Sequence, residues 1–273
     1  MLRHFVSSVV MTFSLISASW AQDDADALFD AMGLPEIITI MRDEGLTYGD
    51  TIARDMFPSG LTPRWADAVA QVYDVDAMTT EMRSAFVAAL EGQDTAPMLE
   101  FYQSDLGARI VNLEISAREA MLDPALEAAS KDLAGDAARD QTPRYQLIDQ
   151  FIIANDLIES NVVGGLNSNY AFVSGLLSGG ATVPGLTSET LLEDIWAQEP
   201  SIRASTTEWL YAFLMLSYEP LADAELTTFM DATQTPEGRA LTAALFTAFD
   251  QVFERVSRDL GSAASGFITS QEL

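Results

Sequence analysis

The chain has 273 residues, of which 41 are acidic and 14 are basic, and its formal net charge is −27. It contains no cysteine and one histidine, His4, which lies in a segment that we expect to be removed, so disulfides, thiol nucleophiles, Cys/His zinc sites and a Ser-His-Asp triad are excluded. A charge this negative repels nucleic acid and anionic lipid headgroups, and we expect neither as a partner.

Residues 1–21 have the pattern of a secretory signal peptide. Arg3 gives a basic start, residues 5–18 are apolar, and Ser19 and Ala21 are small residues at the spacing that a signal peptidase needs. The apolar run is shorter than the ~20 residues that span a bilayer, so we expect cleavage after Ala21 rather than a membrane anchor. The mature protein is therefore expected to be periplasmic or secreted, where its acidic surface would also keep it soluble in salt.

Helical periodicity dominates the rest of the chain. Apolar residues recur every three or four positions, proline falls between these stretches or in their first turns, and strand-like alternation of useful length is absent. The sequence therefore predicts an all-α fold. The expected helices cover residues 63–73, 78–90, 108–122, 144–160, 204–218 and 236–260.

A polar stretch at residues 130–143 separates two groups of these helices. We expect Gly135 to end one helix and Thr142 and Pro143 to begin the next. This boundary predicts two helical units of ordinary domain size. The predicted divisions are a signal peptide at 1–21, a first unit at 22–140, a second unit at 141–262 and a C-terminal tail at 263–273.

The two units share a Ser/Thr-x-x-Gly motif, which occurs as Ser104 to Gly107 and again 131 residues later as Thr235 to Gly238. We predict that each hydroxyl caps the helix that follows it. Each glycine then lies in the first turn of that helix, where it allows a neighbouring helix to pack closely. We interpret the pair as a tandem duplication of one helical unit.

These residues resemble the bacterial family called domain of unknown function 2059 (DUF2059), whose members are secreted or periplasmic helical domains. The family's hallmark is an aromatic helix end followed by this turn into a long helix. The motif residues are Phe101, Tyr102, Ser104 and Gly107 in the first unit and Thr235 and Gly238 in the second. The second unit departs from the hallmark, because Ala232 matches Phe101. The resemblance implies an exported helical protein, with two tandem copies, and supplies no catalytic residue.

Glu159 is the acid that best fits an enzyme hypothesis. It is followed by Ser160 at the end of an apolar helix, a pair similar to the Glu-Ser of lytic transglycosylases. Such an enzyme needs a glutamic acid whose pKa is raised by an apolar pocket. The further glycine, methionine and glutamine signals of that class are not convincingly present, so we keep a cell-wall glycosidase or lytic-transglycosylase-like activity as the alternative function. A solvated carboxylate near a helix end is the simpler interpretation of Glu159.

Two further groups of charged residues have spacings that can carry a function. Glu114 and Arg118 are four residues apart, so they form a polar cluster if buried and a weak helix pair if exposed. Asp74, Asp76 and Glu81 lack the glycine and the further oxygens of a calcium loop, and the two aspartates fit helix ends better. We therefore expect no metal and no cofactor.

Residues 161–188 contain no charged side chain. Gly175 and Gly179 form a small-xxx-small pair, but polar residues in the middle, a proline and several glycines argue against a membrane span. We expect a buried helix followed by a glycine-rich loop, with a loosely packed hairpin that binds a partner or a membrane surface as the alternative.

Aromatic residues at helical spacing are expected mainly in the core, with a hydrophobic-ligand cavity between the helices as a minor alternative. They are Trp65, Tyr73, Tyr102, Trp196, Trp209, Tyr211 and Tyr218. Taken together, these features favour a non-enzymatic periplasmic module that binds an unknown protein or envelope component.

Overall fold

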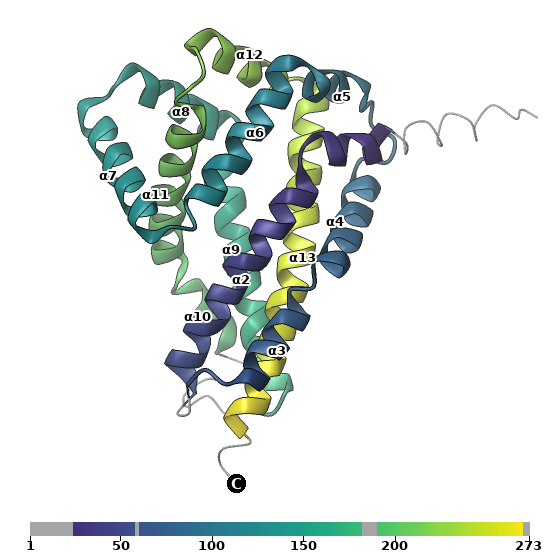
Figure 1. The fold of residues 1–273 in the computed structure, drawn as a ribbon, viewed down its shortest axis with the longest axis vertical. Coiled ribbons are helices and arrows are strands. Elements are labelled where there is room, and N and C mark those ends of the chain that lie inside the picture. The colour runs from purple at the N-terminus through teal and green to yellow at the C-terminus, as the bar shows by residue number, and fades with distance from the viewer. Residues whose placement is uncertain (1–23, 58–59, 182–189, 270–273) are drawn as a thin grey trace, which may run out of the picture.

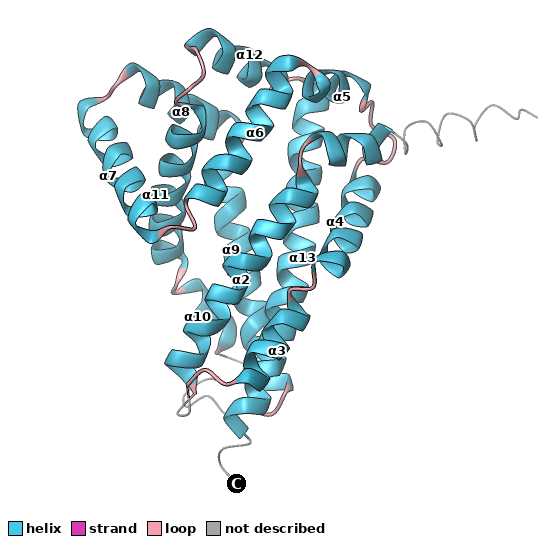
Figure 2. Ribbon diagram, viewed as in Figure 1, coloured by secondary structure: helices cyan, strands magenta, loops and turns pink. Residues whose placement is uncertain are grey.

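The computed structural model describes residues 24–57, 60–181 and 190–269, and within these ranges every regular element is a helix (Figure 1, Figure 2). The predicted all-α fold is thus confirmed. The expected signal peptide, the last part of the uncharged segment and residues 270–273 lie outside the described residues.

A short helical segment over residues 24–31 comes first, and the numbered helices follow it in chain order. In the first half they are α2 (Leu34–Met56), α3 (Pro63–Val72), α4 (Val75–Ala89), α5 (Ala96–Gln103), α6 (Asp105–Ala120) and α7 (Pro124–Asp140). In the second half they are α8 (Pro143–Ala154), α9 (Leu157–Ser178), α10 (Leu191–Trp196), α11 (Glu199–Tyr218), α12 (Asp223–Thr233) and α13 (Pro236–Thr269).

Hydroxyl and carboxylate caps set several of the helix starts. Thr62 and Thr142 each accept a hydrogen bond from the backbone N–H three residues on, at 3.2 Å, and a proline follows each of them. Asp74 caps α4 in the same way at 2.8 Å, as expected of an acid at a helix end. The prediction for Gly135 was wrong: α7 continues past it to Asp140 and ends where Gln141 adopts a left-handed conformation.

The long helix α13 packs most extensively against α9, with which it runs side by side (Figure 1). Glycines allow this approach from both sides. A side chain at Gly175 of α9 would lie 2.1 Å from the carbonyl oxygen of Arg258, and one at Gly261 of α13 would lie 2.0 Å from that of Phe172. The small residues of the uncharged segment therefore join two helices of this molecule. No described helix is long and apolar enough to cross a membrane.

The predicted tail from residue 263 differs from the structure, because α13 runs on to Thr269. Apolar contacts hold this last part of the helix in place. Ala264 is fully buried, and the Phe267 ring stacks on Phe57, with centroids 5.6 Å apart, and meets Trp65 edge-on.

Buried side chains from both halves form one large core. The halves interlock: α4 packs against α13, and α11 packs against α6 and α7. The boundary expected near residue 140 falls between α7 and α8, but the core does not divide there. Removal of either half would therefore expose a large apolar surface of the other.

The two Ser/Thr-x-x-Gly turns have the same geometry. The Ser104 hydroxyl accepts a hydrogen bond from Gly107 N at 3.1 Å, and the Thr235 hydroxyl accepts one from Gly238 N at 3.0 Å. A side chain at Gly107 would lie 2.1 Å from the Phe101 carbonyl oxygen, and one at Gly238 would lie 2.2 Å from that of Ala232. Both caps and both close approaches therefore form as predicted, which fits the duplication hypothesis.

Candidate functional site

A cavity of about 670 Å³ lies between α2, α6, α9, α11 and α13, with contributions from α5, α8 and α12. Its volume is in the range of pockets that enclose a small organic ligand. Aliphatic and aromatic side chains supply most of the lining. The aromatic ones are Tyr102, Phe151, Trp209, Phe213, Tyr218, Phe229, Phe246, Phe249 and Phe253.

Glu114 of α6 is the polar residue that stands out in this lining. Its Oε1 accepts a hydrogen bond from the Tyr218 hydroxyl at the end of α11. Burial raises the pKa of Glu114 to about 7, although the Tyr218 hydrogen bond lowers it in part. A carboxyl among apolar side chains is costly to ionise, so Glu114 changes its charge near neutral pH.

The two tyrosines beside Glu114 are themselves buried, at 6% exposure for Tyr102 and 1% for Tyr218. Burial raises the pKa of both phenols, and the neighbouring Glu114 carboxylate raises each further. Both tyrosines therefore stay protonated, and Tyr218 remains a hydrogen-bond donor throughout the physiological range.

Arg118 lies one turn beyond Glu114, but it pairs with a different acid. Its guanidinium donates two hydrogen bonds to Glu44 of α2, at 3.0 and 2.8 Å, and lies over the Trp209 ring at 5.9 Å from the centroid. The sequence left two possibilities for Glu114 and Arg118, a buried polar cluster or a weak exposed helix pair. The structure places both residues at the cavity and directs them to different helices.

Asp250 of α13 is the fourth charged residue of the lining. Burial, followed by repulsion from Glu254, raises the pKa of Asp250. A side chain at Gly164 of α9 would lie 2.6 Å from Asp250 Oδ1. That glycine therefore gives the carboxylate room beside the cavity.

A smaller pocket of about 360 Å³ adjoins the cavity and shares Asn161 and Trp209 with it. The charged residues of this pocket are Glu127 and Lys131, which form an ion pair at 2.7 Å. The side chains of Asn161 and Trp209 thus lie between an outer polar pocket and the inner apolar one.

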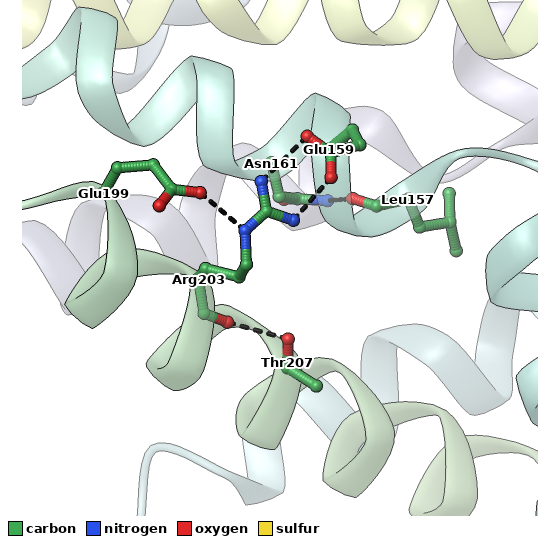
Figure 3. A network of polar contacts seen from close by, with 6 residues as sticks. All are labelled: Leu157, Glu159, Asn161, Glu199, Arg203 and Thr207. Atoms are coloured by element: carbon green, nitrogen blue, oxygen red, sulfur yellow. Dashed lines mark hydrogen bonds and ion pairs between the residues drawn. The ribbon is translucent and has the colours of Figure 1, made fainter. Parts of the chain in front are cut away.

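Glu159 is exposed and is not part of the cavity lining, and Figure 3 shows the network of polar contacts in which it lies. Arg203 of α11 reaches between Glu159 and Glu199 and donates hydrogen bonds to both, including one of 2.9 Å to Glu159 Oε2. The Arg203 guanidinium lowers the pKa of Glu159. A general acid needs the opposite shift, so this environment does not favour the role that the sequence suggested.

Most of the motif residues of the family resemblance shape the helix junctions rather than the cavity. Phe101 stacks on Phe229 with the ring centroids 5.8 Å apart, and Ser104 and Gly107 form the turn. Tyr102 is the exception, because it lines the cavity. Thr235 and Gly238 form the corresponding turn before α13.

One sequence signal could have identified Glu114 as more than half of a helix pair. It is four residues after Ile110 and three before Ala117, so it lies on the apolar stripe of α6. Both of those neighbours are buried. An acid on a buried stripe requires a partner or a cavity, and the structure provides both.

No curated protein and no solved structure matches this chain. One family model matches part of the chain. The matched segment runs from the start of α4 almost to the end of α7, so it contains the first Ser-x-x-Gly turn, Glu114 and Arg118. Residues 76–136 match the family DUF2059, which is described as an uncharacterized protein conserved in bacteria.

Proposed function

We propose that this protein is an exported, non-enzymatic binding module that encloses a small hydrophobic ligand in the cavity between α2, α6, α9, α11 and α13. The observation that carries the proposal is a cavity of about 670 Å³ with a largely apolar and aromatic lining. Apolar surface left uncovered inside a protein forgoes stabilisation that a ligand of matching shape would restore.

The place of the cavity in the fold supports the same function. Its walls come from helices of both halves, which also share one large core, so the site needs side chains from both halves. Export is the second part of the proposal and is supported by the signal-peptide pattern of residues 1–21. A mature protein that begins at Gln22 in the periplasmic fraction would establish it by mass spectrometry.

The alternative of a wall glycosidase loses support from Glu159, whose pKa is lowered by Arg203. The acid in an apolar setting is Glu114. Asp250 is a second carboxyl in the same lining, but a glycosidase also needs polar partners for the hydroxyls of the sugar, and this lining is mainly aliphatic and aromatic. Absence of peptidoglycan cleavage by the mature protein would complete this argument.

A neutral apolar fluorophore, N-phenyl-1-naphthylamine, provides the direct test. The mature chain should bind one equivalent with enhanced emission. Thr242→Phe adds a ring at the cavity wall and should weaken binding about tenfold or more. Thr247→Phe is the matched control, because both threonines lie on α13 and bond the carbonyl four residues before, but Thr247 is exposed. Equal binding by both variants would refute the cavity as the site.

A further inference from the structure

We infer that the ligand of this cavity is a hydrophobic cation, an ammonium group on an aliphatic or aromatic body, with Glu114 as its counter-ion. This inference rests on the proposed function, since it names the class of ligand that the same cavity selects.

The first argument is the balance of charge in the lining. Four charged side chains contribute to it: Glu44, Glu114, Arg118 and Asp250. Arg118 is the one cation among them, and its two short hydrogen bonds to Glu44 neutralise that pair. Neither Glu114 nor Asp250 forms an ion pair with a described residue. Among the residues that the structure places, the cavity lining therefore has two carboxyls without an ion-pair partner and no free positive charge.

The second argument is the geometry at Glu114. Its Oε1 accepts the Tyr218 hydroxyl, while its Oε2 accepts no hydrogen bond from the described part of the chain. The phenol thus fixes the direction of the carboxylate and leaves one oxygen available. An ammonium group has N–H donors and a positive charge, and both are complementary to that oxygen.

The third argument is the aromatic content of the walls. The negative faces of aromatic rings attract an organic cation, and this attraction is stronger where water is excluded. Trp209 already has the Arg118 guanidinium over its ring at 5.9 Å, so the cavity contains one such contact. An anion of the same size would instead meet the rings and two carboxyls at low dielectric, where repulsion is strong.

A metal ion fits this lining poorly. Calcium takes six to eight oxygen ligands, and within the described ranges no group of three or more His, Asp or Glu residues could hold a metal. The hydrocarbon walls suit a cation that carries its own apolar surface. The acidic excess of the whole chain would also draw cations towards the protein.

The test is a charge series on one hydrocarbon body. Octylammonium, octanol and octanoate are each titrated into the mature protein at pH 8 by calorimetry. An alkylamine is protonated at that pH, as a lysine side chain is. We expect octylammonium to bind at least about tenfold more tightly than octanol, from one charge-assisted hydrogen bond, and octanoate to bind most weakly.

The outcomes separate the two proposals. Failure of all three ligands to bind would overturn the cavity function itself. Binding of octanol with no advantage for octylammonium would leave that function in place and overturn the inference. Because the wild-type series decides this point, the result does not depend on whether a variant folds.

Glu114→Gln then assigns the preference to one residue. The variant should lose the advantage of octylammonium over octanol and keep its affinity for octanol within about twofold. Glu119→Gln on the exposed side of α6 is the matched control and should keep the full preference. A Glu114→Gln protein that still prefers the cation would show that another group is the counter-ion.

Discussion

Glu114 and Glu159 both contact α11, at opposite ends of that helix, and the contrast between them shows what makes a carboxyl a binding group here. Glu114 meets a neutral phenol in an apolar cavity, and burial raises its pKa to about 7. Glu159 meets the Arg203 guanidinium at the surface, and that cation lowers its pKa. The hydrogen-bonding partner and the solvent exposure of each acid, rather than its residue type, decide whether it can bind a ligand.

Truncation of Tyr218 and of Arg203, the partners of the two acids, should give the largest difference in the free energy of unfolding. Tyr218→Ala removes a ring that is 1% exposed and packs edge-on against Phe151. We therefore expect the free energy of unfolding to fall by about 3–5 kcal/mol. Arg203→Ala removes one side of a surface ion pair and should change stability little. Urea denaturation of both variants measures the two changes in the free energy of unfolding. Similar losses for both would break the contrast between a buried and a solvated site.

The pH dependence of stability should separate the two acids next. The pKa of Glu114 is raised in the folded chain, from an ordinary 4.5 to about 7, so the folded state binds this proton more tightly than the unfolded state does. Its contribution is fully present below pH 4.5 and is lost as pH rises through 7, by about 3 kcal/mol at most. The pKa shift of Glu159 has the opposite sign, so its contribution to stability is lost only as pH falls through its lowered pKa.

The measurement is the difference in unfolding free energy between wild type and Glu114→Gln at pH 5 and pH 8. The variant should lose less stability than wild type over this interval, whereas Glu159→Gln should follow wild type. Octylammonium should also bind wild type more weakly at pH 5. The other charged or titratable groups of the site are Tyr102, Tyr218, Asp250 and the Glu44–Arg118 pair. A wild-type curve parallel to that of Glu114→Gln would contradict the raised pKa.

Loss of the Tyr218 hydroxyl alone should have a smaller effect on stability. Tyr218→Phe keeps the ring but removes the hydrogen bond that lowers the pKa of Glu114, so this pKa should rise further above 7. The stability cost should be about 1 kcal/mol. Carboxyl titration by NMR follows the shift directly. Tyr211→Phe is a control, because its hydroxyl donates to Asp149 instead, and it should leave Glu114 unchanged.

The helical fold could be predicted from the sequence because it depends on local signals. Apolar periodicity, prolines in first turns and capping residues such as Thr62 and Thr142 all act within a few positions. The two Ser/Thr-x-x-Gly turns also depend on local signals, and the sequence predicted both of them. Gly135 misled the prediction, since a lone glycine inside a helix costs only about 1 kcal/mol and ends the helix only if the chain turns there.

The site was harder to predict because it is built from distant residues. Glu114 and Arg118 are neighbours in sequence, yet their partners Tyr218 and Glu44 come from other helices. No short pattern shows that Glu159 would meet Arg203 at the surface. The apolar stripe of α6 does mark Glu114 as unusual, but the cavity that surrounds it follows from the interlocking of the two halves.

The smallest expected effect is at Glu159 itself. Glu159→Gln removes the acid that the sequence favoured, but it leaves the cavity lining unchanged, since Glu159 is not part of it. We therefore expect N-phenyl-1-naphthylamine and octylammonium to bind this variant within about twofold of wild type, and peptidoglycan to remain uncut by either protein. Loss of a cleaving activity in Glu159→Gln would reverse the comparison, because the surface acid would then be the functional one. If instead only Glu114→Gln changes ligand preference, the difference in pKa between two carboxyls that both contact α11 is what distinguishes a binding site from a solvated ion pair.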